Sequence, residues 1–195
     1  MIGYDIEQIM ADRDLITVNE ALSIGISKTQ LYETLRKKNY EKVGHGVYAS
    51  PNSWVDEMLI LHLRCPNAVF SHDEALYYHE LVDREPMQHT ITVYSGYNTK
   101  RLTDDGIKVY TIKKELLELG KIVVTNNMGN EIPMYNLERT ICDLIRNRSS
   151  YEIQDFQTAL KTYVKRKDRD LNLLMGYAKK LRVENKIRQY LEVLI

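Results

Sequence analysis

Histidines, cysteines and adjacent Ser, His and Asp residues are the side chains of this 195-residue chain best suited to catalysis or metal binding. The five histidines stand at positions 45, 62, 72, 79 and 89, and the cysteines at 65 and 142. Neither set has the CxxC, HxH or HExxH spacing that brings ligands onto one metal ion. Ser71, His72 and Asp73 are adjacent, and consecutive side chains of a helix point apart, so they predict no catalytic triad. With no glycine-rich phosphate loop either, the sequence predicts no catalytic residue, no metal site and no cofactor.

A second arrangement combines Asp104 and Asp105 with Lys108, as in a metal-dependent nuclease. The segment TDDG fits a turn better than a pair of strands around a metal ion. For this reason a nuclease-like, nucleic-acid-processing enzyme guided by a winged helix is only the alternative function. Acidic residues on strands near a lysine would favour it.

Residues 17–38 offer a different chemistry, the polar and basic side chains that contact DNA. The segment predicts two helices joined by a turn: Thr17 and Ser27 are the expected N-caps, and Gly25 lies where the turn needs φ > 0. Leu31 and Leu35 are spaced i, i+4 and are expected to face inward, which frees the second helix for a DNA major groove. Near the N-terminal end of that helix lie Lys28, Thr29, Gln30 and Tyr32.

Residues 40–50, YEKVGHGVYAS, alternate around Gly44-His45-Gly46 and predict a small two-stranded hairpin. A hairpin directly after the second helix is the winged variant of the helix-turn-helix, and its tip carries Lys42 and His45 toward phosphate or an adjacent groove. Residues 4–10 are expected to supply the supporting first helix. The expected N-terminal domain is a winged helix-turn-helix DNA-binding domain over residues 1–50.

The charge of the chain is balanced overall but unevenly distributed. Lys and Arg number 27, as do Asp and Glu, so the whole molecule has no strong positive field. Residues 1–26 carry one basic side chain and five acids, a net charge of −4, whereas residues 27–50 carry five and two, a net charge of +3. Positive charge therefore begins where the expected DNA-contacting helix begins.

The remaining residues, 51–195, predict a second domain of mixed α+β structure. Amphipathic helices are expected at 54–66 and 71–83, strands at 89–95, 106–112, 121–125 and 131–135, and a further helix after Asn136. Ser71 and Glu74 are spaced as a capping box for the second of these helices. Three more helices follow, the second of them capped by Asp170. The expected fold class is α+β, with an α+β core over residues 51–147 and a helical part over residues 148–195.

The last fifty residues, 146–195, carry twelve basic side chains and six acids, a net charge of +6. Their two basic clusters are KRKDR at 165–169 and KKLR at 179–182. Such clusters are either solvated helix faces or a second surface for nucleic acid or a partner. This candidate surface comprises Lys161, Lys165, Arg166, Lys167, Arg169, Lys179, Lys180 and Arg182.

The apolar runs of the chain are far shorter than a bilayer requires, and the first ten residues hold acids where a secretory signal holds basic residues. Cys65 and Cys142 lie in apolar helical patterns and fit reduced core thiols better than a disulfide or a metal pair. The sequence therefore predicts a soluble, cytoplasmic protein without a membrane partner.

Five segments follow the N-terminal module in a characteristic order: SHDEALYYHELVDREP, HTITVYSGYN, KVYTIKKELLELG, YNLERTICDLIRNR and YVKRKDRDLNLLMGYAKKLRVENKIRQYLEVL. In this order the chain resembles, over nearly its whole length, the AbiEi family antitoxins of type IV toxin–antitoxin systems, which act in abortive infection as phage defence. The resemblance implies that the winged helix binds inverted repeats in its own operon promoter and represses it. It also implies that the C-terminal domain counteracts a nucleotidyltransferase-like toxin without forming a stable complex.

Carried onto this sequence, the resemblance places DNA reading on the helix that opens at Ser27. Gln30 could make a bidentate contact to adenine, and basic residues after it would hold the DNA backbone. The implied DNA-binding residues are Ser27, Lys28, Thr29, Gln30, Tyr32, Lys37, Lys38, Lys42 and His45. The C-terminal basic clusters would extend the DNA footprint or serve toxin neutralisation.

The expected protein is thus a non-enzymatic antitoxin and transcriptional autorepressor. A third class, a winged-helix regulator with a ligand-sensing C-terminal domain, would require a concave pocket with convergent polar groups. A symmetric dimer and two cooperating monomers would both match inverted repeats in double-stranded DNA.

Overall fold

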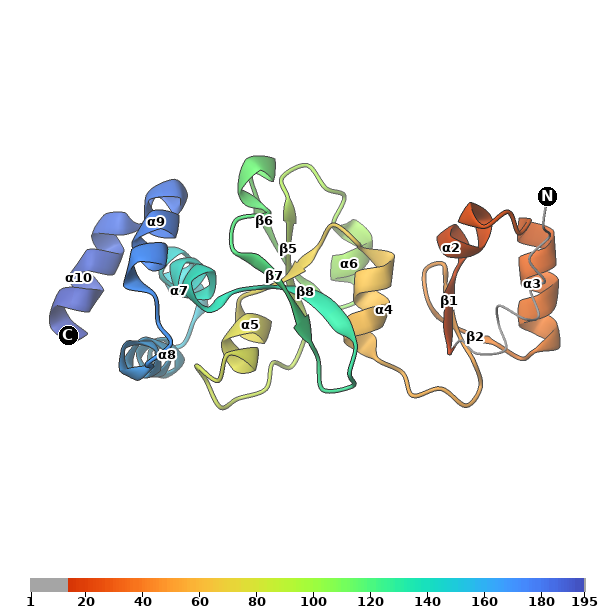
Figure 1. The fold of residues 1–195 in the computed structure, drawn as a ribbon, viewed down its shortest axis with the longest axis horizontal. Coiled ribbons are helices and arrows are strands. Elements are labelled where there is room, and N and C mark those ends of the chain that lie inside the picture. Colours follow the sequence, from red (N-terminus) through yellow and green to blue (C-terminus); the bar gives the residue numbers. More distant parts are fainter. Residues whose placement is uncertain (1–13, 195) are drawn as a thin grey trace. The chain divides into compact units, whose positions relative to one another are not determined.

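The computed structural model describes residues 14–194, and Figure 1 shows helices and strands in both halves, with helices at the C-terminal end. Contacts divide the chain into two units: the first runs to Pro66 and includes Asn127–Asn130, and the second comprises Asn67–Asn126 and Glu131–Ile195. The first unit thus extends beyond the expected boundary at residue 50, because helix α4 (Glu57–Arg64) contacts the hairpin before it. The expected helix at residues 4–10 lies outside the described residues.

The described residues of the first unit form three helices, α4 among them, and a three-stranded antiparallel sheet. Its other elements are β1 (Leu15–Thr17), α2 (Val18–Ser23), α3 (Lys28–Lys37), β2 (Glu41–Gly44) and β3 (Val47–Ala49). The strand order is β1-β3-β2. The helices, the turn and the predicted hairpin are confirmed, whereas β1 was not expected because three residues are too few to establish alternation. Its core is Ile16, Ala21, Ile26, Leu31 and Leu35.

The helix ends of this unit follow from local side chains. Thr17 Oγ1 accepts a hydrogen bond from the N–H of Glu20 at 3.1 Å and so caps α2. Gly25 has φ +89°, a conformation that costs glycine little and lets the chain turn sharply into α3. Ile26 then enters the core and Ser27 caps the second helix, as predicted.

The second unit is built on a five-stranded mixed sheet of order β6-β5-β4-β8-β7. The strands are β4 (Val69–Phe70), β5 (Thr90–Tyr94), β6 (Lys108–Ile112), β7 (Lys121–Thr125) and β8 (Glu131–Tyr135). β5 runs parallel to β6, and β4 runs parallel to β8. Four of these strands confirm the sequence prediction, while β4 has two residues and carries no periodic pattern. Between the strands lie α5 (Asp73–Tyr78), α6 (Lys100–Asp104) and the 3-10 turn η1 (Lys114–Leu116).

A group of helices completes the second unit: α7 (Leu137–Arg146), the 3-10 turn η2 (Arg148–Ser150), α8 (Ile153–Lys165), α9 (Leu171–Leu181) and α10 (Glu184–Leu194). The predicted caps are confirmed, because Asn136 accepts from the N–H of Arg139 and Asp170 from that of Leu173. α7 lies among the C-terminal helices (Figure 1) and contacts α8, α9 and α10. Its side chains are buried from Leu137 to Ile145. Both cysteines are buried thiols that form no disulfide. Among the described residues, no helix has the length and apolar character needed to cross a membrane.

The start of α5 differs from its prediction, and the capping box from Ser71 to Glu74 is wrong. The N–H of Glu74 donates instead to Oγ1 of Thr90 at 2.9 Å, from the neighbouring strand. Ser71 Oγ lies 2.8 Å from Thr92 Oγ1 and 3.0 Å from Nδ1 of His72. His72 precedes the helix with φ +55°, so its side chain meets that of Ser71, and the expectation that these two point apart is also wrong.

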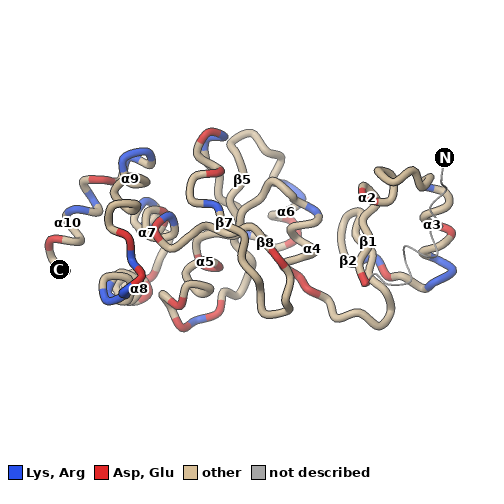
Figure 2. The backbone as a smooth tube through the Cα atoms, in the orientation of Figure 1, with Lys and Arg blue, Asp and Glu red and all other residues tan. Residues whose placement is uncertain are grey.

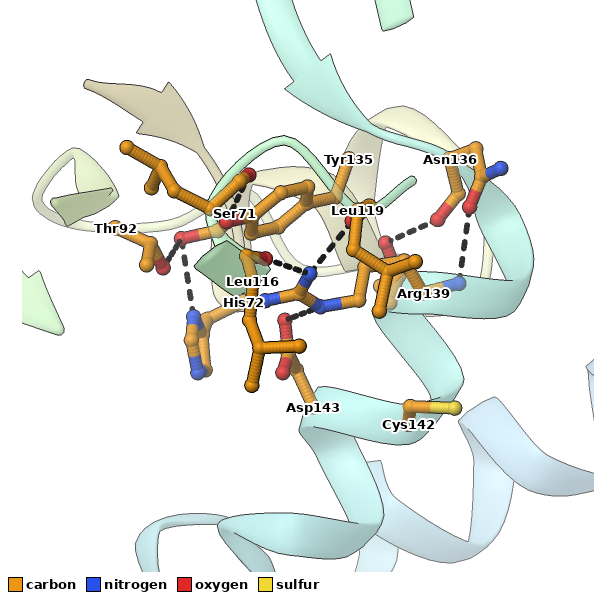
Figure 3. A network of polar contacts seen from close by, with 12 residues as sticks. Ser71, His72, Thr92, Leu116, Leu119, Tyr135, Asn136, Arg139, Cys142 and Asp143 are labelled. Carbon is orange, nitrogen blue, oxygen red and sulfur yellow. Dashed lines mark hydrogen bonds and ion pairs between the residues drawn. The ribbon is translucent and has the colours of Figure 1, made fainter. Parts of the chain in front are cut away.

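A buried ion pair ties α7 to the loop around η1 (Figure 3). Arg139 is fully buried, and its Nε donates to Oδ2 of Asp143 at 2.9 Å, one helical turn further on. Its Nη1 donates to the backbone carbonyls of Leu116 and Leu119 at 2.9 and 2.6 Å. The guanidinium carbon lies 3.9 Å from the ring centre of Tyr135. Burial raises the pKa of Asp143, and the adjacent guanidinium opposes that rise.

Replacing Asp143 by Asn keeps the shape of the side chain and removes the charge that balances Arg139. We expect Asp143→Asn to lower the free energy of unfolding by about 3–5 kcal/mol, because it leaves a buried cation without its counter-charge. Urea unfolding followed by circular dichroism measures the change. Asp168→Asn is the matched control, since its pair with Arg166 lies at the surface of the same unit. Equal losses in the two variants would contradict the role given to the buried pair.

Candidate nucleic-acid interface

Helix α3 turns its leucines and Thr34 inward and its other polar residues outward. Leu31 and Leu35 are buried, which confirms the face predicted from their spacing. The side chains of Lys28 and Thr29 are exposed, and Tyr32 is 47% exposed. The N-terminal half of α3 therefore presents to solvent the residues that a DNA-contacting helix uses.

Gln30 is exposed but is held by the cap of its own helix. Its Oε1 accepts from the backbone N–H of Ser27 at 3.2 Å and from the Ser27 hydroxyl at 3.0 Å. In return, Ser27 Oγ accepts from the N–H of Gln30 at 3.3 Å, which completes a capping box. A bidentate contact to adenine uses both the oxygen and the nitrogen of the amide. The readout predicted for Gln30 therefore competes with the start of the helix.

A groove of about 360 Å³ lies in the first unit where α3, the β2–β3 hairpin, the start of α2 and the end of α4 meet. Four of its lining residues, Lys28, Tyr32, Lys42 and His45, belong to two separate segments of the predicted DNA-contacting set. Arg64 also lines the groove and was not predicted, because the sequence assigned its helix to the other domain. The groove gathers three cationic side chains and a histidine.

The walls of this groove are fixed by contacts within the unit. The rings of Tyr32 and Tyr48 meet edge to face, with centroids 6.2 Å apart. The N–H of Val18 donates to the carbonyl of Gly46 at 2.9 Å and so joins the hairpin tip to α2. Gly46 has φ +72°, which the tight hairpin requires. The distance between helix and hairpin is therefore set before any ligand arrives.

The basic residues of this unit occupy two places. Within the part of the chain that the structure describes, Lys28 and Lys42 form no ion pair, and both are exposed. Lys37 and Lys38 lie at the far end of α3, roughly 15 Å along its axis from Lys28, and do not line the groove. Figure 2 shows this separation as blue segments at the two ends of α3.

Two arginines of the C-terminal candidate surface, Arg166 and Arg169, are engaged in hydrogen bonds within the chain. Arg166 donates to both carboxylate oxygens of Asp168, at 2.9 and 2.7 Å, and to the carbonyl of His79 at 2.8 Å. Arg169 donates to the carbonyl of Arg166 at 2.7 Å. The other predicted members are exposed on α8, on the loop after it and at the end of α9 (Figure 2): Lys161, Lys165, Lys167, Lys179, Lys180 and Arg182.

The residues that suggested a nuclease have other positions. Lys108 pairs with Asp73 at 2.8 Å, not with the acids of the TDDG segment. Asp104 ends α6 and Asp105 follows it, so the expected turn begins within a short helix. Among the described residues, no three His, Cys, Asp or Glu side chains gather as metal ligands.

No protein-family model and no curated protein matches the chain. Among solved structures, the chain is similar to the crystal structure of the RV2827C protein from Mycobacterium tuberculosis, with a TM-score of 0.62 and 14% sequence identity. The similarity covers 89% of this chain and 69% of that one. At this identity the likeness shows a common fold alone.

Because of the capping box, the contribution of Gln30 to stability can be measured without any ligand. We expect Gln30→Ala to lower the free energy of unfolding by about 0.5–1 kcal/mol, because the N–H of Ser27 loses its acceptor. Gln30→Glu keeps an acceptor and adds a negative charge near the positive end of the helix, so it is expected to be at least as stable as the wild type. Thr29→Ala, at the neighbouring exposed position, is the control. If urea unfolding gives Gln30→Ala the same free energy of unfolding as the wild type, the side chain of Gln30 does not stabilise the helix as a cap.

Proposed function

We propose that this protein is a DNA-binding repressor of its own operon and the antitoxin of a nucleotidyltransferase-like toxin. The DNA-binding half of the proposal rests on the groove that α3 shares with the β2–β3 hairpin. Lys28, Lys42 and Arg64 all line it, together with His45 at the hairpin tip. Duplex DNA carries closely spaced phosphates, and such a group of cations on a preformed surface is suited to hold them.

The order of elements supports a winged helix-turn-helix in this unit. α2 and α3 are joined by a sharp turn at Gly25, and a hairpin follows α3 directly. In the proposed complex the N-terminal half of α3 enters the major groove, and the hairpin acts as the wing against the neighbouring backbone. Thr29 and Tyr32 are the exposed side chains beside Lys28 that would then reach base edges or sugar.

Phosphate contacts supply most of the affinity in this arrangement. Each lysine that neutralises one phosphate releases condensed counterions, so affinity falls as salt rises. Lys28 and Lys42 have no carboxylate partner among the described residues, so no ion pair has to break when they bind. Gln30 can add base readout only by leaving its cap.

The contribution of the groove can be measured with DNA from upstream of the gene for this protein. We expect Lys28→Ala and Lys42→Ala each to weaken binding and to reduce the slope of log K against log salt by about 0.9, the value for one lost phosphate contact. Fluorescence anisotropy over a series of salt concentrations gives both quantities. Lys186→Ala, an exposed lysine of the second unit, is the control.

Two outcomes would contradict the repressor proposal. One is an unchanged affinity and slope in both groove variants. The other is cleavage of the same DNA when magnesium is added, which would favour the alternative of a nuclease-like enzyme.

The antitoxin half of the proposal rests on the ordered segments that resemble the AbiEi family. Two of these segments correspond to α7 and to the helical part from α8 to α10. Because Arg166 and Arg169 are committed to contacts within the chain, the exposed lysines around them are the cations available to a partner. We assign Lys165 and Lys167 to toxin neutralisation on this basis.

Reversing the charge of Lys165 and Lys167 together distinguishes toxin neutralisation from DNA contact and from a solvated helix face. We expect the double variant Lys165→Glu, Lys167→Glu to bind operator DNA normally and to lose most of its rescue of toxin-expressing cells, because its exposed positive surface is reversed. The control pair Lys113→Glu, Lys186→Glu reverses two exposed charges elsewhere in the same unit. Full rescue of toxin-expressing cells by the double variant would mean that Lys165 and Lys167 only form a solvated helix face. A lower affinity for operator DNA would assign these lysines to the DNA-binding surface.

A further inference from the structure

A small pocket lies in the second unit between the end of α7 and strands β5 and β6. Its volume is about 60 Å³, several times the roughly 10–15 Å³ that one water needs. Its wall includes His72, Arg139, Asp143, Arg146 and Asn147, with the exposed Thr111 also lining it. The space suits a compact group of a few heavy atoms.

The buried guanidinium that lines this pocket has an unused donor. Nε and Nη1 of Arg139 are occupied by Asp143 and by backbone carbonyls. Its Nη2 is also buried and has no hydrogen-bond partner among the described residues. Figure 3 shows this end of Arg139 turned to the side on which His72 lies. Buried polar groups are normally satisfied, so this N–H group calls for an acceptor inside the pocket.

The opposite wall is a histidine held rigidly in a neutral state. Its ring stacks on that of Tyr110, with centroids 3.4 Å apart and planes 5° apart. Nε2 of His72 lies 3.1 Å from the amide nitrogen of Asn147, which donates, so the ring proton sits on Nδ1 and points to Ser71. Burial, and then the positive charge of Arg139, lower the pKa of His72 well below its usual value. Its φ of +55° adds backbone strain, which is common at binding sites.

The charges around the pocket favour an anion. Arg139 and Arg146 contribute +2 and Asp143 contributes −1, so the lining carries a net charge of +1 with His72 neutral. The Asp143 carboxylate is already paired with Arg139, and the nearby Lys108 is paired with Asp73 outside the lining. An oxyanion would accept from the free Nη2 and gain the second guanidinium at the exposed end of α7.

We propose that this pocket binds a phosphate group, held between Nη2 of Arg139 and the guanidinium of Arg146. A tetrahedral oxyanion offers several acceptors to two planar donors, which arginine matches better than lysine. The volume admits the phosphate group alone, so any nucleoside attached to it would extend past Thr111 into solvent. Inorganic phosphate and a nucleoside monophosphate share this chemistry. The site is independent of the proposed DNA binding.

Calorimetric titration of the full-length protein with sodium phosphate, at constant ionic strength in chloride, tests the site. Arg146→Ala removes an exposed guanidinium of the pocket, and Thr111→Glu adds a negative charge at its lining. We expect one phosphate per chain, with affinity reduced about tenfold or more in both variants, because the first removes a charge-assisted contact and the second adds a charge that repels the anion. Lys186→Ala, which removes an exposed cation away from the pocket, is expected to bind as the wild type does.

Circular dichroism without phosphate shows whether each variant keeps the wild-type fold. A phosphate-dependent rise in the melting temperature of the wild type, reduced in Arg146→Ala, is expected as well, because binding to the native state stabilises it. Absence of phosphate binding by the wild type would overturn the proposal, as would equal affinity in all four proteins.

A second titration, with AMP in the presence of phosphate, distinguishes the two sources of the group. Displacement of phosphate by AMP assigns the pocket to a nucleotide. Phosphate binding that AMP does not displace assigns it to inorganic phosphate. Both results uphold the site, and neither depends on whether the first unit binds DNA.

Discussion

The structure of the second unit depends on protein groups that surround one buried guanidinium, that of Arg139, in place of water. A cation without water is costly, and Arg139 replaces that water with Asp143, two backbone carbonyls around η1 and the face of Tyr135. These partners come from α7, from the loop before β7 and from β8, so their positions are fixed together. Gly120 shows how close the loop must come: it has φ +77°, and a Cβ there would lie 2.6 Å from that of Arg139. The same constraint that orders the unit also leaves Nη2 facing a pocket.

Local signals in the sequence were sufficient for much of the fold. Thr17, Ser27, Asn136 and Asp170 all cap helices as predicted, because an N-cap and the N–H that it accepts from are only a few residues apart. The box expected from Ser71 failed because Thr90, on a strand sixteen residues beyond Glu74, supplies the acceptor instead. β1 and β4 were missed since they are defined by their partners in the sheet and are too short for alternation. The division near Pro66 likewise depends on α4 meeting the hairpin in space.

The candidate sites were predictable to a smaller extent. The spacing of Leu31 and Leu35 was enough to give the exposed face of α3, and residue type gave its cations. Which charges are available is a property of the tertiary structure: Arg166 is engaged by the carbonyl of His79, eighty-seven positions away, and Lys108 by Asp73. Gln30 is exposed and yet occupied by its own helix cap. The pocket beside Arg139 has no sequence pattern, because its lining comes from β5, β6, the end of α7 and the residue before α5, which meet only in the folded unit.

The groove of the first unit and the pocket beside Arg139 place their positive charge in different ways, and this difference limits the anions that each can hold. Exposed lysines on flexible stems adapt to many phosphates along a polymer, and salt screens them strongly. A buried arginine has a fixed orientation and a low local dielectric, so it favours one small oxyanion in one geometry and is screened less. Lys28 and Lys42 are of the first kind and Arg139 is of the second. Binding of DNA and binding of phosphate by this chain would then respond differently to ionic strength. Only the proposed phosphate contacts a charge that is buried from solvent, the guanidinium of Arg139.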